Sequence, residues 1–464
     1  MEECIAGLQS LKQELSAQSL LCQGQVPAWL RGTLLRNGPA LFEAGDTKLR
    51  HWFDGYAMLY RFMIDDQTVT YSNRFLVSEA YQAATMKQRM MFSEFASEPR
   101  KGLWQHLQEI FKPQLTDNTN VNLGKIAGRF FAATETPDLI EFDPITLNTL
   151  GKFKFSDTIN GQVTTAHPLY DHHEQALYNF TVTIGPRCSY QIYRIKQGAL
   201  TRELVAQLPV RSPAYMHSFA MTEHYIILIE PPLRLKLMQF MFCRKPYIEN
   251  YVWDSRDCVR FHVIEKKTGR VMGRFEAEPA FFFHQLNAYE HGSELYIDIP
   301  IFPDASIINS LYLNEIEVGN IVPPRPMRYR LNLATTRLSF EPLAECNIEL
   351  PRFHDALHQS RPYSYVYGVN AHKTGDFLNR LVKIDIRAGD YQVWSDTHCY
   401  PSEPVFVPKP QAITEDDGVV LSVVLNAQKQ QSFLLFLDGQ TFEEVARAQL
   451  PHAVPFGFHG HFFQ

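Results

Sequence analysis

Apolar and polar residues alternate with a period of two in seven segments of the chain, and a short polar turn interrupts each of them. The segments begin at Leu59, Leu139, Ile192, Arg260, Tyr329, Leu381 and Leu434. Such alternation around turns rich in Gly, Asp or Thr is typical of β-hairpins. Hairpins at intervals of roughly 50–80 residues predict an all-β fold, a seven-bladed β-propeller with one outer hairpin per blade. Two stacked β-sandwiches are the alternative on pattern alone.

Three insertions interrupt the β rhythm, at 79–114, 231–250 and 302–325, and the first two are helix-like and rich in Met and Leu. Insertions on one face of a propeller usually build its binding face, so we expect these segments to form the binding face of the ring. No flexible linker or low-complexity tract separates the repeats. We therefore expect residues 1–464 to form a single propeller domain.

A second repeating unit carries histidine. His167, His217 and His284 hold the same place in it, where we expect a strand that carries the histidine, a polar turn and a returning aliphatic strand. Each unit precedes a different outer hairpin, so in a closed ring the three would lie on inner strands of separate blades and converge on the axis. His459 is a fourth candidate, because the glycines around it permit close backbone approach. The alternative for each is a hydrogen-bonded core or turn histidine.

Convergent imidazoles indicate a transition metal. Neutral nitrogen ligands suit Zn, Cu, Fe or Ni, and structural zinc sites normally use cysteine. Because four histidines leave the metal charge uncompensated, buried acids are expected around them, where they would accept the second ring N–H of each imidazole. Glu135, Glu349 and Glu403 lie in apolar, strand-edge contexts and are the candidates. Exposed turn carboxylates are the alternative interpretation.

Composition narrows the functional class. The 44 basic and 50 acidic residues give a net charge of −6 without long runs of one sign, which argues against nucleic-acid binding. Seven scattered cysteines without a CxxC motif predict reduced thiols in a cytoplasmic protein. The acidic start of the chain does not resemble a signal peptide, and the apolar runs are too short to span a bilayer. The 33 phenylalanines suggest an apolar binding cavity as well as a core.

The ordered motifs of the chain resemble those of the carotenoid cleavage oxygenases. RGTLLRNGP and HWFDGYAMLYRF come first, TAHPLYD, YMHSF, FFFHQLNAYE and YPSEPVFV follow, and EVARAQLP and FHGHF come last. The resemblance covers nearly the whole chain. It is closest to the animal-type branch, which includes β-carotene dioxygenases and the retinoid isomerohydrolase.

The resemblance implies a seven-bladed propeller with a helical dome over one Fe(II) ion per chain. The four histidine ligands of the family match His167, His217, His284 and His459. Its three supporting glutamates match Glu135, Glu349 and Glu403, paired with His217, His284 and His459 in that order. His167 would then have no protein carboxylate. No residue beyond the metal centre is expected to be catalytic.

The activity implied is cleavage of a carotenoid or apocarotenoid double bond by O2, which yields aldehydes such as retinal. An iron-dependent retinoid or carotenoid isomerase or isomerohydrolase is an alternative, because the ligand set does not distinguish the two. A non-catalytic carotenoid-binding protein is a second alternative. Thr134 stands where stilbene-cleaving relatives carry a lysine, which disfavours a phenolic stilbene as substrate.

Two apolar segments with basic neighbours predict peripheral contact with a membrane surface. In the first insertion the candidates are Leu103, Trp104, Leu107 and Phe111, and in the second they are Leu237, Phe240 and Phe242. Helices packed on top of the propeller are the alternative. Together with the composition, these segments predict a cytoplasmic protein that associates peripherally with membranes.

Overall fold

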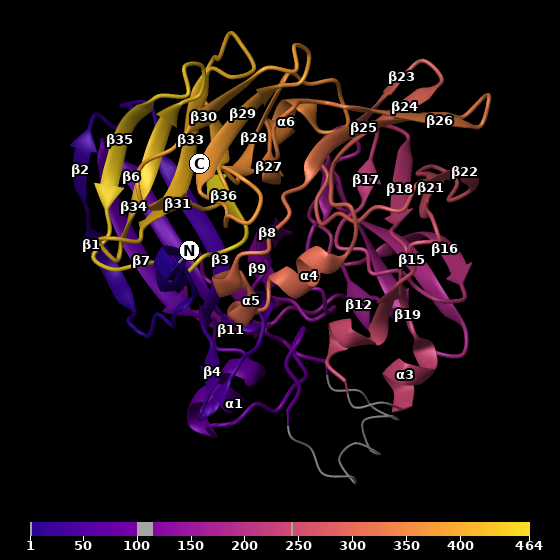
Figure 1. Ribbon diagram of the computed structural model, residues 1–464, viewed down its shortest axis with the longest axis horizontal. Coiled ribbons are helices and arrows are strands. Elements are labelled where there is room, and N and C mark those ends of the chain that lie inside the picture. Colours follow the sequence, from indigo (N-terminus) through magenta and orange to yellow (C-terminus); the bar gives the residue numbers. More distant parts are fainter. Residues whose placement is uncertain (1, 100–114, 243–244) are drawn as a thin grey trace.

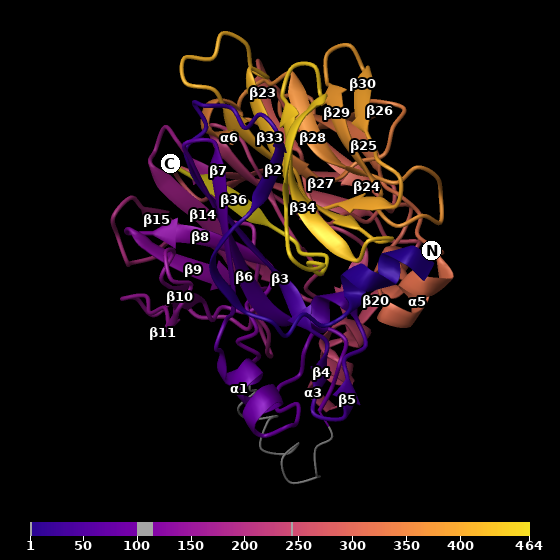
Figure 2. The same cartoon turned by 90° about the vertical axis from the view of Figure 1, so that its left-hand side faces the viewer.

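The computed structural model describes residues 2–99, 115–242 and 245–464. Over these residues the chain is mostly β-strand, and seven antiparallel sheets surround a common axis (Figures 1 and 2). The prediction of a seven-bladed β-propeller is therefore confirmed. We number the blades I–VII in the order of their outer hairpins along the chain.

The first four blades contain the following strands, given from the inner to the outer edge of each sheet. Blade I comprises β36 (Gly460–Phe463), β3 (Gly32–Leu41), β6 (Tyr56–Asp65), β7 (Thr68–Phe75) and β1 (Leu15–Ser19). Blade II comprises β8 (Asn122–Ile126), β9 (Arg129–Ala133), β10 (Ile140–Phe142) and β11 (Thr149–Lys152). In blade III, β12 (Val163–Thr164) and β13 (Leu169–Asp171) both pair with β14 (Ala176–Thr183), followed by β15 (Cys188–Lys196) and β16 (Glu203–Val210). Blade IV comprises β17 (Ala220–Met221), β18 (Tyr225–Glu230), β21 (Val259–Glu265) and β22 (Val271–Ala277).

The remaining blades follow the same plan. Blade V comprises β23 (Asn287–His291), β24 (Glu294–Ile301), β25 (Arg325–Asn332) and β26 (Arg337–Pro342). Blade VI comprises β27 (Glu349–Arg352), β28 (Tyr365–Asn370), β29 (Arg380–Asp385) and β30 (Tyr391–Trp394). In blade VII, β31 (Cys399–Pro401) and β32 (Val405–Pro408) both pair with β33 (Gly418–Asn426), followed by β34 (Gln431–Asp438), β35 (Glu444–Gln449) and β2 (Leu21–Gly24). Two short ribbons lie outside the blades, β4 (Glu43–Ala44) with β5 (Thr47–Lys48) and β19 (Leu233–Leu235) with β20 (Tyr251–Trp253).

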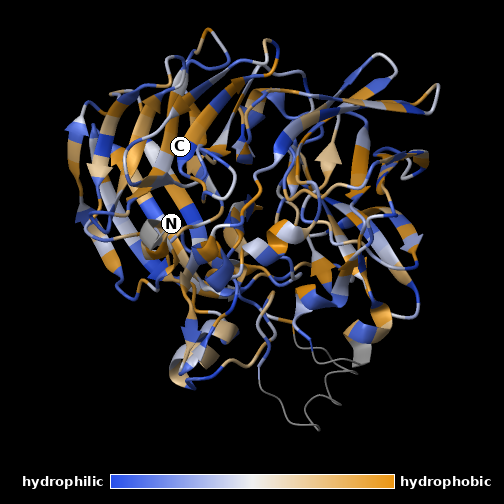
Figure 3. Ribbon diagram, in the orientation of Figure 1, coloured by the Kyte–Doolittle hydropathy of each residue, from blue (hydrophilic) through white to orange (hydrophobic). Residues whose placement is uncertain are grey.

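The seven predicted hairpins are the outer hairpins of the seven blades, from β6–β7 in blade I to β34–β35 in blade VII. Strand β16, at the outer edge of blade III, and the third strands of other blades, such as β21 and β25, have one better-covered face, so burial tends to alternate along them. The middle strands of a blade are covered on both faces and are nearly continuously apolar, as in β33 and β34. Figure 3 shows the resulting arrangement, with hydrophobic residues concentrated in the strands of the blades.

Two strand pairings close the ring. β36 forms the inner edge of blade I, where it pairs with β3 from Thr33↔Phe463 to Arg36↔Gly460. β2 forms the outer edge of blade VII, where it pairs with β35. Each blade at the junction is therefore built from both ends of the described chain, a closure that the hairpin pattern did not predict.

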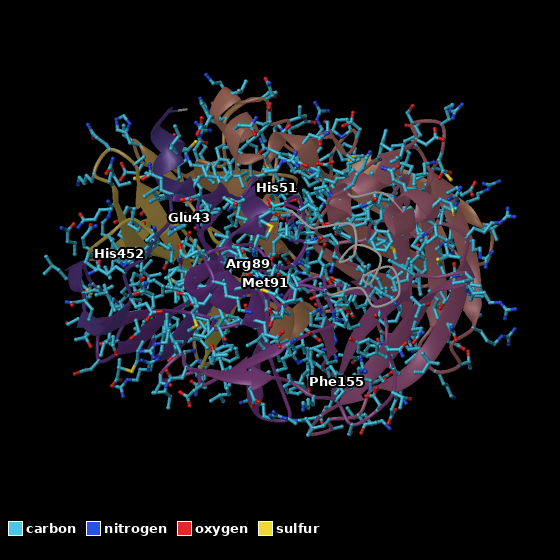
Figure 4. The ribbon with its side chains drawn as sticks, turned by 90° about the horizontal axis from the view of Figure 1, so that it is seen from below. Glu43, His51, Arg89, Met91, Phe155 and His452 are labelled. Carbon is cyan, nitrogen blue, oxygen red and sulfur yellow. The ribbon has the colours of Figure 1, made fainter. Side chains whose placement is uncertain are left out.

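The insertions form helices on one side of the ring, as expected for a dome. They contain α1 (Glu79–Met86), α3 (Leu237–Phe242), the 3₁₀ helix η3 (Tyr247–Asn250), α4 (Ser306–Ser310) and α5 (Leu313–Val318). Two further 3₁₀ helices are η1 (Glu2–Leu8) and η2 (Trp52–Asp54). α6 (Asp355–His358) lies at the opposite end of the molecule from α1 and α3 in both side views (Figures 1 and 2). From below, His51 and Arg89 lie near the middle of the molecule, and Phe155 and His452 lie nearer its edge (Figure 4).

Buried carboxyl groups fix the first insertion to blade I. Asp54 accepts hydrogen bonds from the backbone N–H of Ala96 at 2.8 Å and from the Ser97 hydroxyl at 2.7 Å. Burial raises the pKa of Asp54 to about 6. Glu94 is buried nearby and accepts from the Thr116 hydroxyl at 2.9 Å. Burial, with the charge of Asp54 as a lesser cause, raises the pKa of Glu94 well above its usual value.

Glu94 should make stability depend on pH. Above its ordinary pKa of about 4.3 the unfolded chain releases the proton that the folded chain keeps, so the free energy of unfolding falls as pH rises. Glu94→Gln, which mimics the protonated acid, should remove this loss. Relative to the native protein, the variant should gain up to about 1.4 kcal/mol per pH unit between pH 5 and 8 in urea unfolding. A difference independent of pH would contradict the prediction, and Glu223→Gln at an exposed site is the control.

Candidate metal centre

Four histidine side chains meet on the propeller axis. One ring nitrogen from each of His167, His217, His284 and His459 lies within 4.8 Å of the other three. Nε2 of His167 is 2.9 Å from Nε2 of His217, and Nε2 of His284 is 3.3 Å from Nε2 of His459. The histidines belong to blades III, IV, V and I, respectively. The structure thus brings all four sequence candidates to one point.

The expectation that the histidines sit on strands is wrong in detail. His167 lies between β12 and β13, His217 and His284 lie a few residues before β17 and β23, and His459 directly precedes β36. Side chains within a paired strand point alternately to the two faces of its sheet, toward the neighbouring blades. A residue beyond the end of the strand is free of that constraint, so its ring can point at the axis.

Three glutamates support the cluster. The pairs are Glu135 with His217, Glu349 with His284 and Glu403 with His459, and in each the imidazole Nδ1 lies 2.7 Å from a carboxylate oxygen. These are the pairs that the family resemblance implies. Glu135 belongs to blade II, Glu349 to blade VI and Glu403 to blade VII. Each of the seven blades therefore contributes one side chain to the centre.

The hydrogen bonds determine which ring nitrogens are free to bind a metal. An ionised carboxylate can only accept, so Nδ1 of each paired histidine carries the proton and Nε2 keeps an unshared lone pair. The lone pairs of His284 and His459 then face each other at 3.3 Å, which is repulsive unless a cation lies between them. Convergent neutral imidazoles are the donors that Zn, Cu, Fe and Ni prefer. The donor set therefore fits a transition metal ion.

Burial favours the neutral form of His167, His217 and His459. It is the largest cause that lowers the pKa of His217, even though Glu135 acts in the opposite direction. Burial and the neighbouring imidazoles hold the pKa values of His167 and His459 well below their usual range. Neutral imidazole is the form that binds metals, so these ligands need no deprotonation at neutral pH.

Two arginines distinguish Glu403 from the other glutamates. Nη1 of Arg352 lies 3.4 Å from Oε1 of Glu403 and donates at 2.8 Å to the carbonyl of Gly460. Arg36 is buried and donates to the backbone carbonyls of Glu403 at 2.8 Å and Phe458 at 3.2 Å. The formal charges of a divalent metal, three glutamates and the two arginines sum to +1, so most of the buried charge is compensated. Such compensation is needed for charges buried this deeply.

Three residues that hold the glutamates in place were not predicted from the sequence. Tyr215 donates to Oε1 of Glu135 at 2.9 Å, and Arg36 and Arg352 hold Glu403. Tyr215 and Arg36 lie inside the family-like motifs YMHSF and RGTLLRNGP, and their place in these motifs could have marked them as residues of the site. Arg352 lies three residues after Glu349 in CNIELPRF and carried no comparable signal.

An apolar cavity of about 100 Å³ opens beside the cluster. His217, His284, His459 and the supporting Glu135 and Glu349 line one part of it. The remaining wall is largely aromatic and aliphatic and includes Trp52, Phe53, Phe95, Phe283, Phe302, Ile307, Leu311, Phe377, Leu378 and Phe458. Blade residues and two of the three insertions contribute to this wall, the first through Phe95 and the third through residues such as Ile307 and Leu311. The expected aromatic binding cavity is therefore present, and it leads to the histidines.

The comparisons with known proteins agree with this geometry. The model of the family described as retinal pigment epithelial membrane protein matches residues 8–464. The chain belongs to this family. A carotenoid isomerooxygenase of Galleria mellonella is 33% identical, over 95% of this chain and 92% of that protein. The β,β-carotene 15,15′-dioxygenase of Gallus gallus is 31% identical, over 95% of this chain and 94% of that protein. A solved structure of the Synechocystis apocarotenoid oxygenase, the Glu150Asp mutant, has a TM-score of 0.89 at 26% identity and covers 100% of this chain and 98% of that one.

The predicted membrane contacts of this family member are only partly described. Leu103, Trp104, Leu107 and Phe111 lie outside the described residues, as does the side chain of Phe242. Leu237 and Phe240 lie on α3, where both are half-buried, and Phe240 packs against the core around the apolar cavity. Among the side chains of this helix that the structure describes, Met238 is the exposed apolar one, at 69%. In the described part of the chain, every helix is too short or too polar to cross a bilayer.

Glu403 should be required for tight metal binding. Glu403→Gln removes the charge that orients His459 and leaves Arg352 without its carboxylate partner. We expect metal affinity to fall about 10–100-fold, as measured by titration of metal-free protein with cobalt(II), while the fold is retained in circular dichroism. Glu223→Gln, at an exposed position in blade IV, should bind as the native protein does. Equal affinities for the two variants would contradict this role.

Proposed function

We propose that the protein is a non-haem iron(II) dioxygenase that cleaves a double bond of a carotenoid or apocarotenoid. The observation that carries the proposal is the position of the four-histidine cluster at one end of an apolar cavity. Relatives named carotenoid-cleaving dioxygenase, β,β-carotene 15,15′-dioxygenase and apocarotenoid oxygenase support the substrate class. The reaction consumes one O2 per double bond, and its two oxygen atoms end in two carbonyl products.

His167, His217, His284 and His459 would hold the iron through Nε2, and the three glutamates would keep the Nδ1 protons in place. Iron(II) bound there would supply the electron-transfer chemistry that lets dioxygen react with a conjugated double bond. The aromatic wall would bind the polyene by apolar contact and exclude water. No side chain in the described part of the cavity is needed as a general acid or base, because double-bond cleavage by O2 releases no proton.

The test is incubation of iron-loaded protein with a carotenoid panel under ¹⁸O2, followed by mass analysis of the products. We expect aldehydes that carry the label in both fragments. His217→Ala should lose iron and product formation together, whereas His224→Ala, at an exposed position in the same blade, should retain both. Full iron content and turnover in His217→Ala would refute the ligand assignment.

The same experiment distinguishes the alternatives. Geometric isomers formed without oxygen uptake would identify an isomerase or isomerohydrolase, and stoichiometric pigment binding without turnover would identify a carotenoid-binding protein. Either result would overturn the dioxygenase proposal. Because one relative is named a carotenoid isomerooxygenase, the double-bond geometry of the aldehydes should be determined as well.

We also propose that the protein is cytoplasmic and docks peripherally on membranes through its dome. The apolar residues of 103–111 and the exposed Met238 on α3 support this, together with the basic residues that flank the second segment. Docking there would deliver a hydrophobic substrate from the bilayer to the side of the ring that carries the apolar cavity.

Replacing Trp104 and Phe111 together by Ser should weaken liposome binding strongly, because each buried aromatic side chain is worth about 1–3 kcal/mol in such contacts. Iron content should not change. Activity should fall with carotenoid embedded in liposomes and persist with detergent-dispersed substrate. Ile413→Ser, at an exposed apolar position in blade VII, is the control. Unchanged liposome binding, or loss of iron from the double variant, would contradict the docking proposal.

A further inference from the structure

A second cavity, of about 340 Å³, reaches the histidine cluster from another side. At its inner end it is lined by His167, His284, His459 and Glu403. At its mouth lie Lys125, His172 and Asp355, all of which are exposed. The progression from exposed to buried lining residues shows that this cavity leads from the surface to the candidate metal centre. We call it the axial cavity.

The axial and apolar cavities both reach the histidine cluster, but they are lined by different sets of residues. His284 and His459 line both, whereas His217 lines only the apolar cavity and His167 lines only the axial one. Asp355 and Gln359 of the α6 region contribute to the axial cavity, and dome residues such as Phe95 contribute to the apolar one. The ring of imidazoles therefore separates two routes that open on opposite sides of the propeller.

The lining of the two cavities differs in polarity. The axial cavity carries side-chain amides, imidazoles and charges along its length, among them Asn122, Gln285, Asn287, Arg352 and His461. Oε1 of Gln285 is buried without a hydrogen-bond partner in the described residues, so an acceptor there is free to bind water or a hydrated ion. A divalent cation leaves water only at a large cost in free energy, which an apolar wall cannot offset. Of the two cavities, the axial one has the more polar lining and carries polar partners both at its mouth and beside the cluster.

His167 is the imidazole best suited to receive an ion from this side. Its Nδ1 has no glutamate partner, and in the described part of the chain it makes no hydrogen bond there. The other three rings are each held by a carboxylate at 2.7 Å. Because its ring is the one without that restraint, His167 can turn about its side-chain bonds while the other three ligands stay in place.

We propose that the axial cavity is the path by which the hydrated metal ion enters and leaves the centre, with His167 as the ligand that admits it. This rests on the proposed metal centre but not on the substrate. Lys125 and Arg352 balance the charges of Asp355 and Glu403 along the path. The attraction for the cation therefore arises at the inner end, where three glutamates surround the histidines.

The test compares two tryptophan substitutions, one in each cavity. Gln359→Trp narrows the axial cavity, and Leu378→Trp narrows the apolar one. Protein freed of metal by a chelator is mixed with cobalt(II), and uptake is followed by the cobalt absorption spectrum. A solved structure of the Synechocystis enzyme with cobalt substituted supports this probe. Gln359→Trp should slow uptake and chelator-driven loss by the same factor, about tenfold or more, and leave the equilibrium affinity unchanged. Leu378→Trp should leave both rates unchanged.

Two charge reversals at the mouth of the axial cavity give an independent test of the path. Asp355→Lys should slow cobalt uptake several-fold at low ionic strength, and Lys125→Glu should accelerate it, with both effects reduced by salt. If Leu378→Trp alone slows uptake, or if neither tryptophan variant does, the axial path is refuted. If the unmodified protein fails to bind cobalt, both the metal centre and the path are refuted. If it binds cobalt and the substitutions leave the affinity and the rates of uptake and loss unaltered, the path alone is refuted.

Discussion

Closure of the ring is the constraint on which the centre depends. Seven side chains, one from each blade, join in one cluster of histidines and the glutamates hydrogen-bonded to them, and they can do so only when every blade is in register with its neighbours. The last of them, His459, directly precedes the strand that closes the ring by pairing with β3. Arg36, on β3 itself, binds the backbone on both sides of the junction, at Glu403 and at Phe458. Closure of the fold and assembly of the site are therefore the same structural event.

The centre places charged carboxylates in a buried environment, although burial ordinarily disfavours charge. Burial lowers the pKa of His459 and so favours the neutral form that can bind a metal, but the same burial would be unfavourable for a divalent ion without the three glutamates. Each glutamate also accepts from a further donor, the Tyr215 hydroxyl at Glu135, the Leu350 N–H at Glu349 and the Gly460 N–H at Glu403. One side of this polar core meets an aromatic wall suited to a polyene, and the other side meets a polar passage.

Much of this arrangement was predictable because it is local in sequence. The hairpins alternate because strands such as β16, β21 and β25 have one face better covered than the other. The histidines repeat because equivalent points of successive blades approach the axis. β1 and β2 are short and largely exposed, so they lack that alternation, and the pairing of β36 with β3 joins segments more than 400 residues apart. The glutamate pairs came from the family resemblance. Contacts such as Arg352 with Glu403 depend on the spatial order of blades VI and VII, which no sequence spacing encodes.

The position of His459 also sets an order of events during synthesis. A growing chain can fold its early blades as they emerge, since each blade from II to VI is formed by one continuous stretch. Blade I cannot be completed in this way, because its inner strand is translated after all the other blades. Until then the emerging chain holds three of the four imidazoles and an open ring. Assembly of the four-histidine cluster is thus a late step, taken by a polypeptide whose blades II to VI have already had time to fold.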